Sequence, residues 1–100
     1  MIFDDYLKSI KEIETLAYKL HVLAKGIEAT EMALSGSISS PSVREYIKKE
    51  NEQWTKDYRN AIVSLKNKLK KYEEFGLPNI SIEKIKRKLL KKLYTEDIYA

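Results

Sequence analysis

The residue types that most often carry out chemistry in proteins are scarce in this chain. His21 is its only histidine, and it has no cysteine, so thiol nucleophiles and cysteine-ligated metal sites are excluded. The glutamates lack the Glu-x-x-His spacing of di-iron helical bundles, and no glycine-rich phosphate loop or Gly-x-Ser-x-Gly motif occurs. We therefore expect a protein that is not an enzyme and that uses no metal, no cofactor and no small-molecule substrate.

One class of small helical enzymes, the AroQ-type chorismate mutases, has chains of similar length and needs separate consideration. These enzymes hold a dicarboxylate substrate with several arginines, one of them near the start of the first helix. This chain has only Arg44, Arg59 and Arg87, and none of them lies in its first forty residues. Because planar, bidentate carboxylate recognition favours arginine over lysine, the sequence argues against such an enzyme.

Positive charge gathers in the second half of the chain. The net charge is +4, and between Lys66 and Lys92 ten basic residues stand against three glutamates. Lysine outnumbers arginine sixteen to three, which suits phosphate contacts better than guanine recognition. We predict that this segment binds nucleic acid or an acidic, nucleic-acid-associated partner, and the alternative is a lysine-rich face that is only solvated. The residues predicted to make the contacts are Lys66, Lys70, Lys71, Lys84, Arg87, Lys88, Lys91 and Lys92.

The elements that must position these residues are helices. With 43% hydrophobic residues, three glycines and two prolines, a chain of 100 residues can form one domain but has few turn signals. Apolar residues step by three and four from Tyr6 to Leu34 and again from Val43 to Tyr72. The sequence predicts a single all-α domain with helices over about 4–35, 42–75 and 81–94, joined by turns at 36–41 and 76–80. The first two helices are expected to form a long antiparallel hairpin.

Local signals predict where these helices begin and end. Ser42 and Glu45 have the spacing of a capping box at the start of the second helix, and Gly76 is suited to end it. For the third helix, Ser81 is the expected N-cap, with Ile80 and Ile85 as a hydrophobic staple. Residues 95–100 are expected to fray, although Ile98 and Tyr99 could fold back.

The seam of the predicted hairpin contains a glycine and two polar residues. Gly26 indicates either close packing against the facing helix or a slight bend. Glu31 is expected to pair with Arg44, and Asn51 either fixes the register of the helices or lies at a wet edge. Within the basic third helix, Ile82, Ile85, Leu89, Leu90 and Leu93 form the apolar side that should dock on the hairpin.

A second apolar stripe on the first helix has no partner within a hairpin. Its members are Leu7, Tyr18, Val22 and Ala29, which fall within about 60° of one another on a helical wheel. We predict that this stripe is an oligomer interface, most simply in a dimer that completes a helical bundle. A homo-oligomeric coiled-coil module that binds another protein is accordingly the alternative function.

The segments YLKSIKEIE (6–14) and MALSGSISS (32–40) loosely resemble the helical leader segments of sigma-like transcription regulators encoded by phages. The resemblance covers about the first seventy residues, and the helix-turn-helix that would follow in such a regulator is missing. Size and the absence of motifs favour a small regulatory or anti-host-defence factor of a phage or mobile element. The first residues lack a signal-peptide pattern and no apolar run could cross a bilayer, so we expect a cytoplasmic protein, with membrane binding disfavoured.

Overall fold

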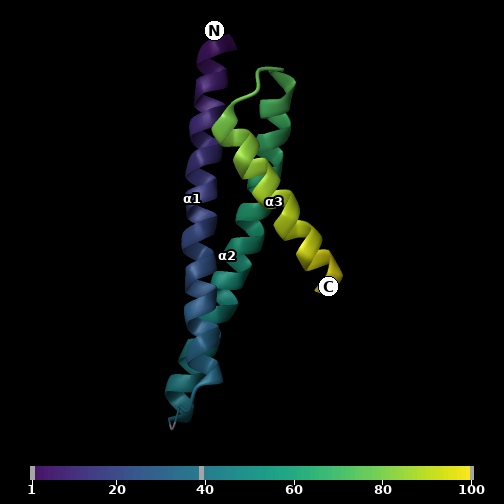
Figure 1. Ribbon diagram of the computed structural model, residues 1–100. Helices are drawn as coiled ribbons and strands as arrows, with labels where there is room; N and C mark the ends of the chain where they lie inside the picture. Colours follow the sequence, from purple (N-terminus) through teal and green to yellow (C-terminus); the bar gives the residue numbers. More distant parts are fainter. Residues whose placement is uncertain (1, 39, 100) are drawn as a thin grey trace. The chain divides into compact units, whose positions relative to one another are not determined.

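The chain forms three helices and no strands in the residues that its structure describes (Figure 1). The computed structural model describes the backbone of residues 2–38 and 40–99 and the side chains of residues 2–38 and 40–91. Helix α1 spans Ile2–Ser35, α2 spans Pro41–Glu74 and α3 spans Ile80–Tyr99. The end of α1 and the start of α2 run antiparallel, which confirms the predicted all-α hairpin followed by a third helix.

Two helix ends differ from the prediction. Helix α1 already begins at Ile2, ahead of Asp4 and Asp5, which lie in its first turn and favour the positive end of the helix dipole. Helix α3 continues to Tyr99, so the expected frayed tail after residue 94 is wrong for the backbone. The physical reason is that residues 95–99 contain neither glycine nor proline to end the helix. The side chains of Leu93, Ile98 and Tyr99 lie outside the described residues.

The start of α2 is capped two residues earlier than predicted. The Val43 amide points to the Ser40 hydroxyl at 3.5 Å, and the Arg44 amide donates to the Ser40 carbonyl at 3.1 Å. Ser40 is therefore the N-cap, and the capping box at Ser42 and Glu45 was a wrong prediction. Pro41 takes the first helical position, where its fixed φ and missing N–H cost nothing.

Asn79, rather than Ser81, caps α3. The Ile82 amide donates to the Asn79 side-chain oxygen at 3.2 Å, and the Glu83 amide donates to the Asn79 carbonyl at 2.9 Å. The predicted hydrophobic staple is also wrong, because Ile80 is 78% exposed. Upstream of this cap, Gly76 has a φ of +67°, as expected for a residue that ends α2 in the left-handed conformation.

Contacts divide the chain into two compact units. The terminal unit combines Met1–Ala17 with Leu65–Ala100, and the hairpin unit is Tyr18–Ser64. The terminal unit therefore contains the start of α1, the end of α2 and the whole of α3. Its buried apolar side chains are Tyr6, Ile10, Ile13, Leu65, Leu69, Tyr72, Ile82 and Leu89. Ile82 and Leu89 confirm that α3 docks through its apolar side, whereas Leu90, expected on that side, is 58% exposed.

The hairpin unit packs α1 against α2 at two identifiable points. A Cβ atom on Gly26 would lie only 2.6 Å from the Trp54 ring, so the glycine allows the two helices to pack closely. This confirms close packing, the first of the two predictions for this residue. The Asn51 amide donates to the Thr30 hydroxyl at 2.8 Å and to the Ile27 carbonyl at 3.4 Å. These bonds cross the seam and favour one register of the two helices.

The ion pair predicted between Glu31 and Arg44 is absent from the described part of the chain. Both side chains are exposed, and the ion pairs found there join other residues. Long charged side chains at an exposed seam gain little from pairing and lose side-chain entropy when they do so.

Candidate nucleic-acid interface

Two ion pairs show which flank of α2 faces each neighbouring helix in the terminal unit. Lys68 of α2 contacts Glu12 of α1, with 2.7 Å between Nζ and Oε2, and Glu73 of α2 contacts Lys86 of α3. The hydrogen bond and charge of Lys68 hold the pKa of Glu12 below its ordinary value. The hydrogen bond that Lys86 donates to Glu73 likewise raises the pKa of Lys86. Position 68 therefore marks the α1 flank of α2, and position 73 marks the α3 flank.

These two positions divide the basic residues of α2 that were predicted to bind a partner into two groups. Lys66 and Lys70 lie seven and three residues before Glu73, so helical periodicity places them on the α3 flank. Lys71 lies three residues after Lys68, on the α1 flank, and its charge contributes to lowering the pKa of Glu12. The structure therefore brings Lys66 and Lys70 to the side of α2 that faces α3 and leaves Lys71 on the other flank.

The basic residues of α3 lie opposite its buried side. Ile82 is fully buried and Leu89 nearly so, which leaves the opposite side of the helix in solvent. The exposed basic residues of that side are Lys84, Arg87, Lys88 and Lys91. Their spacing of three or four residues puts them on successive turns of one helix face. Arg87 is partly oriented by a hydrogen bond from its Nε to the Glu83 carbonyl at 3.4 Å.

Few of these cations are neutralised by carboxylates. Six of them have no ion pair with any carboxylate in the part of the chain that the structure describes: Lys66, Lys70, Lys71, Lys84, Arg87 and Lys88. Lys68 and Lys86, which do form ion pairs, are half-buried and were not predicted to bind a partner. The side chain of Lys92 lies outside the described residues. The ion pairs thus separate lysines that hold the helices together from lysines that face solvent.

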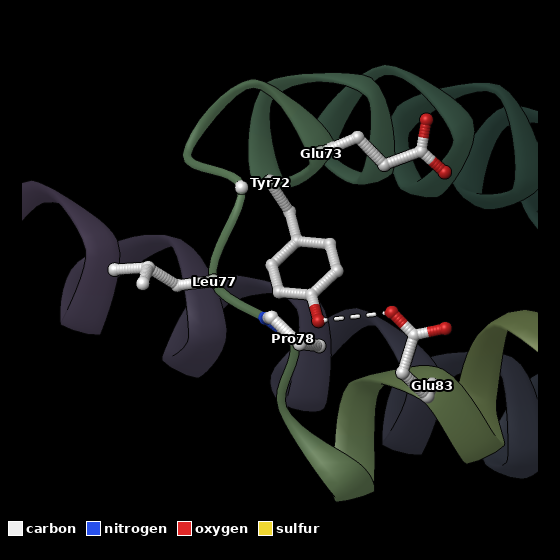
Figure 2. Close-up of a pocket in the computed structure, with 6 residues that line it drawn as sticks. Tyr72, Glu73, Leu77, Pro78 and Glu83 are labelled. Atoms are coloured by element: carbon white, nitrogen blue, oxygen red, sulfur yellow. Dashed lines mark hydrogen bonds between the residues drawn. The ribbon is translucent and has the colours of Figure 1, made fainter.

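A tyrosine organises the turn that leads into α3 (Figure 2). The Tyr72 hydroxyl accepts a hydrogen bond from the Asn79 amide at 2.7 Å and donates one to the Glu83 carboxylate at 3.1 Å. Burial is the main cause that raises the pKa of Tyr72, and the neighbouring Glu83 adds to it. The Tyr6 hydroxyl also donates to the Leu77 carbonyl of the turn, at 2.9 Å. These bonds fix the start of α3 and thereby the direction of its basic face.

A cavity of about 220 Å³ adjoins this turn, with Tyr72, Glu73 and Glu83 in its lining. Figure 2 shows the Glu83 carboxylate directed toward the Tyr72 hydroxyl, with which it forms a hydrogen bond. The Glu73 carboxylate has its own partner in Lys86. These acidic groups therefore stabilise the turn. Sequence reasoning missed this network, although Asn79 directly before an apolar helix start was a usable capping signal.

The stripe predicted as an oligomer interface is open to solvent. Leu7 in the terminal unit is 50% exposed, and in the hairpin unit Tyr18 is 71% exposed, Val22 is 42% exposed and Ala29 is also exposed. None of these residues contributes to the core of its unit. Whether a second chain covers them stays a prediction.

The remaining sequence candidates contribute no further site. His21 is exposed, and no group of three or more histidine, aspartate or glutamate side chains could hold a metal ion within the described residues. A search of those residues for a helix long and apolar enough to cross a membrane found none. Comparisons of the chain with protein-family models, with curated proteins and with solved structures found no match.

Proposed function

We propose that this chain binds nucleic acid through its phosphate backbone, without reading the base sequence. The binding site is the basic surface, which we define as Lys66, Lys70, Lys84, Arg87, Lys88 and Lys91. One observation carries the proposal: these cations are exposed in one compact unit, on α3 and on the flank of α2 that faces it. Lys71 and Lys92 are additional contacts in the proposal.

The chemistry of the basic surface suits phosphates. Lysine ammonium groups act as point charges on phosphate oxygens, and each phosphate contact releases counterions that had condensed on the nucleic acid. Only one of the six residues, Arg87, is an arginine, the residue that most often recognises guanine through two hydrogen bonds. We therefore expect affinity that falls steeply with salt and differs little between sequences.

Fluorescence anisotropy with a labelled duplex of random sequence tests this proposal. Between about 50 and 200 mM salt, log K should fall with a slope of about −0.9 for each phosphate contact, so four contacts give a slope of roughly −3.6. A second duplex of unrelated sequence should bind with similar affinity. For each variant described in the next paragraph, circular dichroism checks that the protein is still helical.

A pair of matched variants distinguishes binding at the basic surface from attraction by the net charge of the protein. The surface variant carries four substitutions on α3: Lys84→Gln, Arg87→Gln, Lys88→Gln and Lys91→Gln. The control variant removes the same charge from exposed basic residues of the hairpin unit: Lys48→Gln, Lys49→Gln, Lys56→Gln and Arg59→Gln. The surface variant should lose binding at the lower salt, and the control should keep most of it.

Two results would contradict the proposal. Equal weakening by the two variants would show that net charge, rather than the basic surface, attracts the nucleic acid. No binding by the unmodified protein at the lower salt would remove the proposal and favour the alternative, a module that binds another protein.

A further inference from the structure

The hairpin unit has a thin core along most of its length. Its buried side chains are Leu20, Leu23, Tyr58, Ala61 and Ile62. None of the described residues from 24 to 57 is fully buried, and the seam residues Ile27, Ile47 and Trp54 are only half-buried. Two helices alone enclose a single seam, so apolar groups beside that seam remain in contact with water unless another helix covers them.

The two sides of this seam can be told apart by their contacts. Trp54 lies over Gly26 on one side of the seam residue Ile27, and Glu28 lies on the other side of that residue. We call the first side the Trp54 face. Helical periodicity adds Val22, Ala29 and Ala33 of α1 to Gly26, and Val43 and Tyr46 of α2 to Trp54.

The Trp54 face is the more apolar of the two sides, and it is open. Val22 is 42% exposed, Val43 is 49% exposed and Tyr46 is 65% exposed. The opposite side instead carries exposed charged residues, namely Glu28, Glu31, Arg44, Lys48 and Arg59. The small residues of α1 on the Trp54 face would let another helix approach closely.

The charges that border the Trp54 face have opposite signs on the two helices. On α1 the bordering charges are Lys19 and Lys25. On α2 they are Glu50 and Asp57. Neither of these carboxylates forms an ion pair with a described residue; Asp57 is half-buried and accepts only a hydrogen bond from Gln53, at 2.9 Å. The face is therefore complementary in charge to a copy of itself.

We propose that the Trp54 face binds the same face of a second copy of this chain, with α1 of each copy against α2 of the other. A two-fold axis parallel to the helices produces this arrangement, in which each helix is antiparallel to the helix it meets and the four helices form a bundle. This dimer is independent of the proposed nucleic-acid binding, because it uses only the hairpin unit.

The register of the hairpin places the charges correctly for this dimer. Because Gly26 is level with Trp54 and Thr30 with Asn51, Asp57 is about level with Leu23 and Glu50 with Thr30. Lys25 lies between these two levels, within about 8 Å of each along the helix axis at 1.5 Å per residue. In the dimer, Lys25 therefore faces Glu50 and Asp57 of the second copy.

The other symmetric arrangement, with α1 against α1 and α2 against α2, is disfavoured by the same charges. It would bring the Glu50 and Asp57 carboxylates of the two copies together. Lys25 would then keep only its contact with Glu28 of its own helix, at 3.8 Å. Like charges placed opposite one another across an interface reduce affinity and exclude that geometry. Charge thus selects one packing of the two hairpins.

Sedimentation equilibrium of the full chain over a range of concentrations tests the dimer. The unmodified protein should reach twice the chain mass of 11.7 kDa. The face variant, Val22→Glu with Tyr46→Glu, should stay at the mass of one chain and keep its helicity, because both side chains are exposed. The control, Glu31→Lys with Lys48→Glu on the opposite side, should still dimerise.

A charge exchange makes the test specific for the proposed pairing. Lys25→Glu should weaken the dimer because it faces Glu50 and Asp57 of the second copy. Adding Glu50→Lys and Asp57→Lys to that variant should restore the dimer. A single-chain mass for the unmodified protein at every concentration would overturn the proposal, as would a dimer that the face variant leaves intact or a triple variant that stays monomeric.

Discussion

Replacing Gly26 with alanine measures how closely α1 and α2 approach each other in the hairpin unit. The new Cβ atom would lie 2.6 Å from Cδ2 of Trp54 and 2.8 Å from both Cε2 and Cε3, well inside the contact distance of about 3.5–4.0 Å for carbon atoms. All three atoms belong to the rigid indole ring. Either the Trp54 side chain must leave the seam or the two helices must separate, and overpacking of this kind costs about 1–3 kcal/mol.

A second effect of the substitution has the opposite sign. Alanine favours a helix over glycine by about 1 kcal/mol, so the net destabilisation by Gly26→Ala is between about 0 and 2 kcal/mol. A double-mutant cycle separates the two effects. In a Trp54→Leu background the ring is gone, and Gly26→Ala should then stabilise the protein by about 1 kcal/mol.

Urea unfolding followed by circular dichroism gives the four free energies of unfolding that the cycle needs. Gly36→Ala is the matched control, because its Cβ would meet its nearest atom, the Ala33 carbonyl oxygen, at an ordinary 3.6 Å. The reasoning would be refuted if Gly26→Ala stabilised the unmodified protein as much as it stabilises the Trp54→Leu variant. That outcome would mean that the indole ring does not occupy the space beside Gly26.

Three further predictions concern the terminal unit. Tyr72→Phe leaves the Asn79 amide without its hydroxyl acceptor and should lower the free energy of unfolding in urea by about 1–3 kcal/mol; an unchanged urea midpoint would contradict the hydrogen bonding at this turn. Ser9 has a buried hydroxyl with no hydrogen-bond partner in the described structure, so Ser9→Ala should raise the urea midpoint by the equivalent of about 1 kcal/mol or more, whereas a lower midpoint would indicate a partner. Because the ion pair with Lys68 lowers the pKa of Glu12, its stabilisation is complete at neutral pH and is lost as the pH falls through that lowered pKa. The difference in urea midpoint between the unmodified protein and Lys68→Met should therefore be present at pH 7 and shrink as acid protonates Glu12, and a difference independent of pH would show that the pair contributes nothing.

The sequence by itself determined the helices and their connection. Steps of three and four between apolar residues depend only on the geometry of one helix, so the stripes from Tyr6 and from Val43 identified α1 and α2 correctly. Gly76 ended α2 as predicted, because only a residue without a Cβ atom adopts a positive φ at no cost. The basic residues of α3 were also placed on an exposed face from periodicity alone.

Local capping was predicted less well, because neighbouring residues compete for the same position. Ser40, Ser42, Asn79 and Ser81 can all accept a hydrogen bond from a free helix amide, so the sequence offers more than one candidate at the starts of α2 and α3. At α3 the N-cap is Asn79, because its amide donates a hydrogen bond to the Tyr72 hydroxyl of α2 and is held in place by it. A partner seven residues earlier, in the preceding helix, is invisible to a rule that considers only adjacent positions.

The tertiary structure alone decided which groups meet across helices. The contact of Trp54 with Gly26, the bond between Asn51 and Thr30, and the division of the lysines between ion pairs and solvent all depend on register. A shift of one residue turns a helix by 100° and rises only 1.5 Å, so every pair across the seam changes while the pattern along each helix stays the same. Periodicity therefore predicted which side of each helix is buried, whereas packing determined which residues contact one another across the helices.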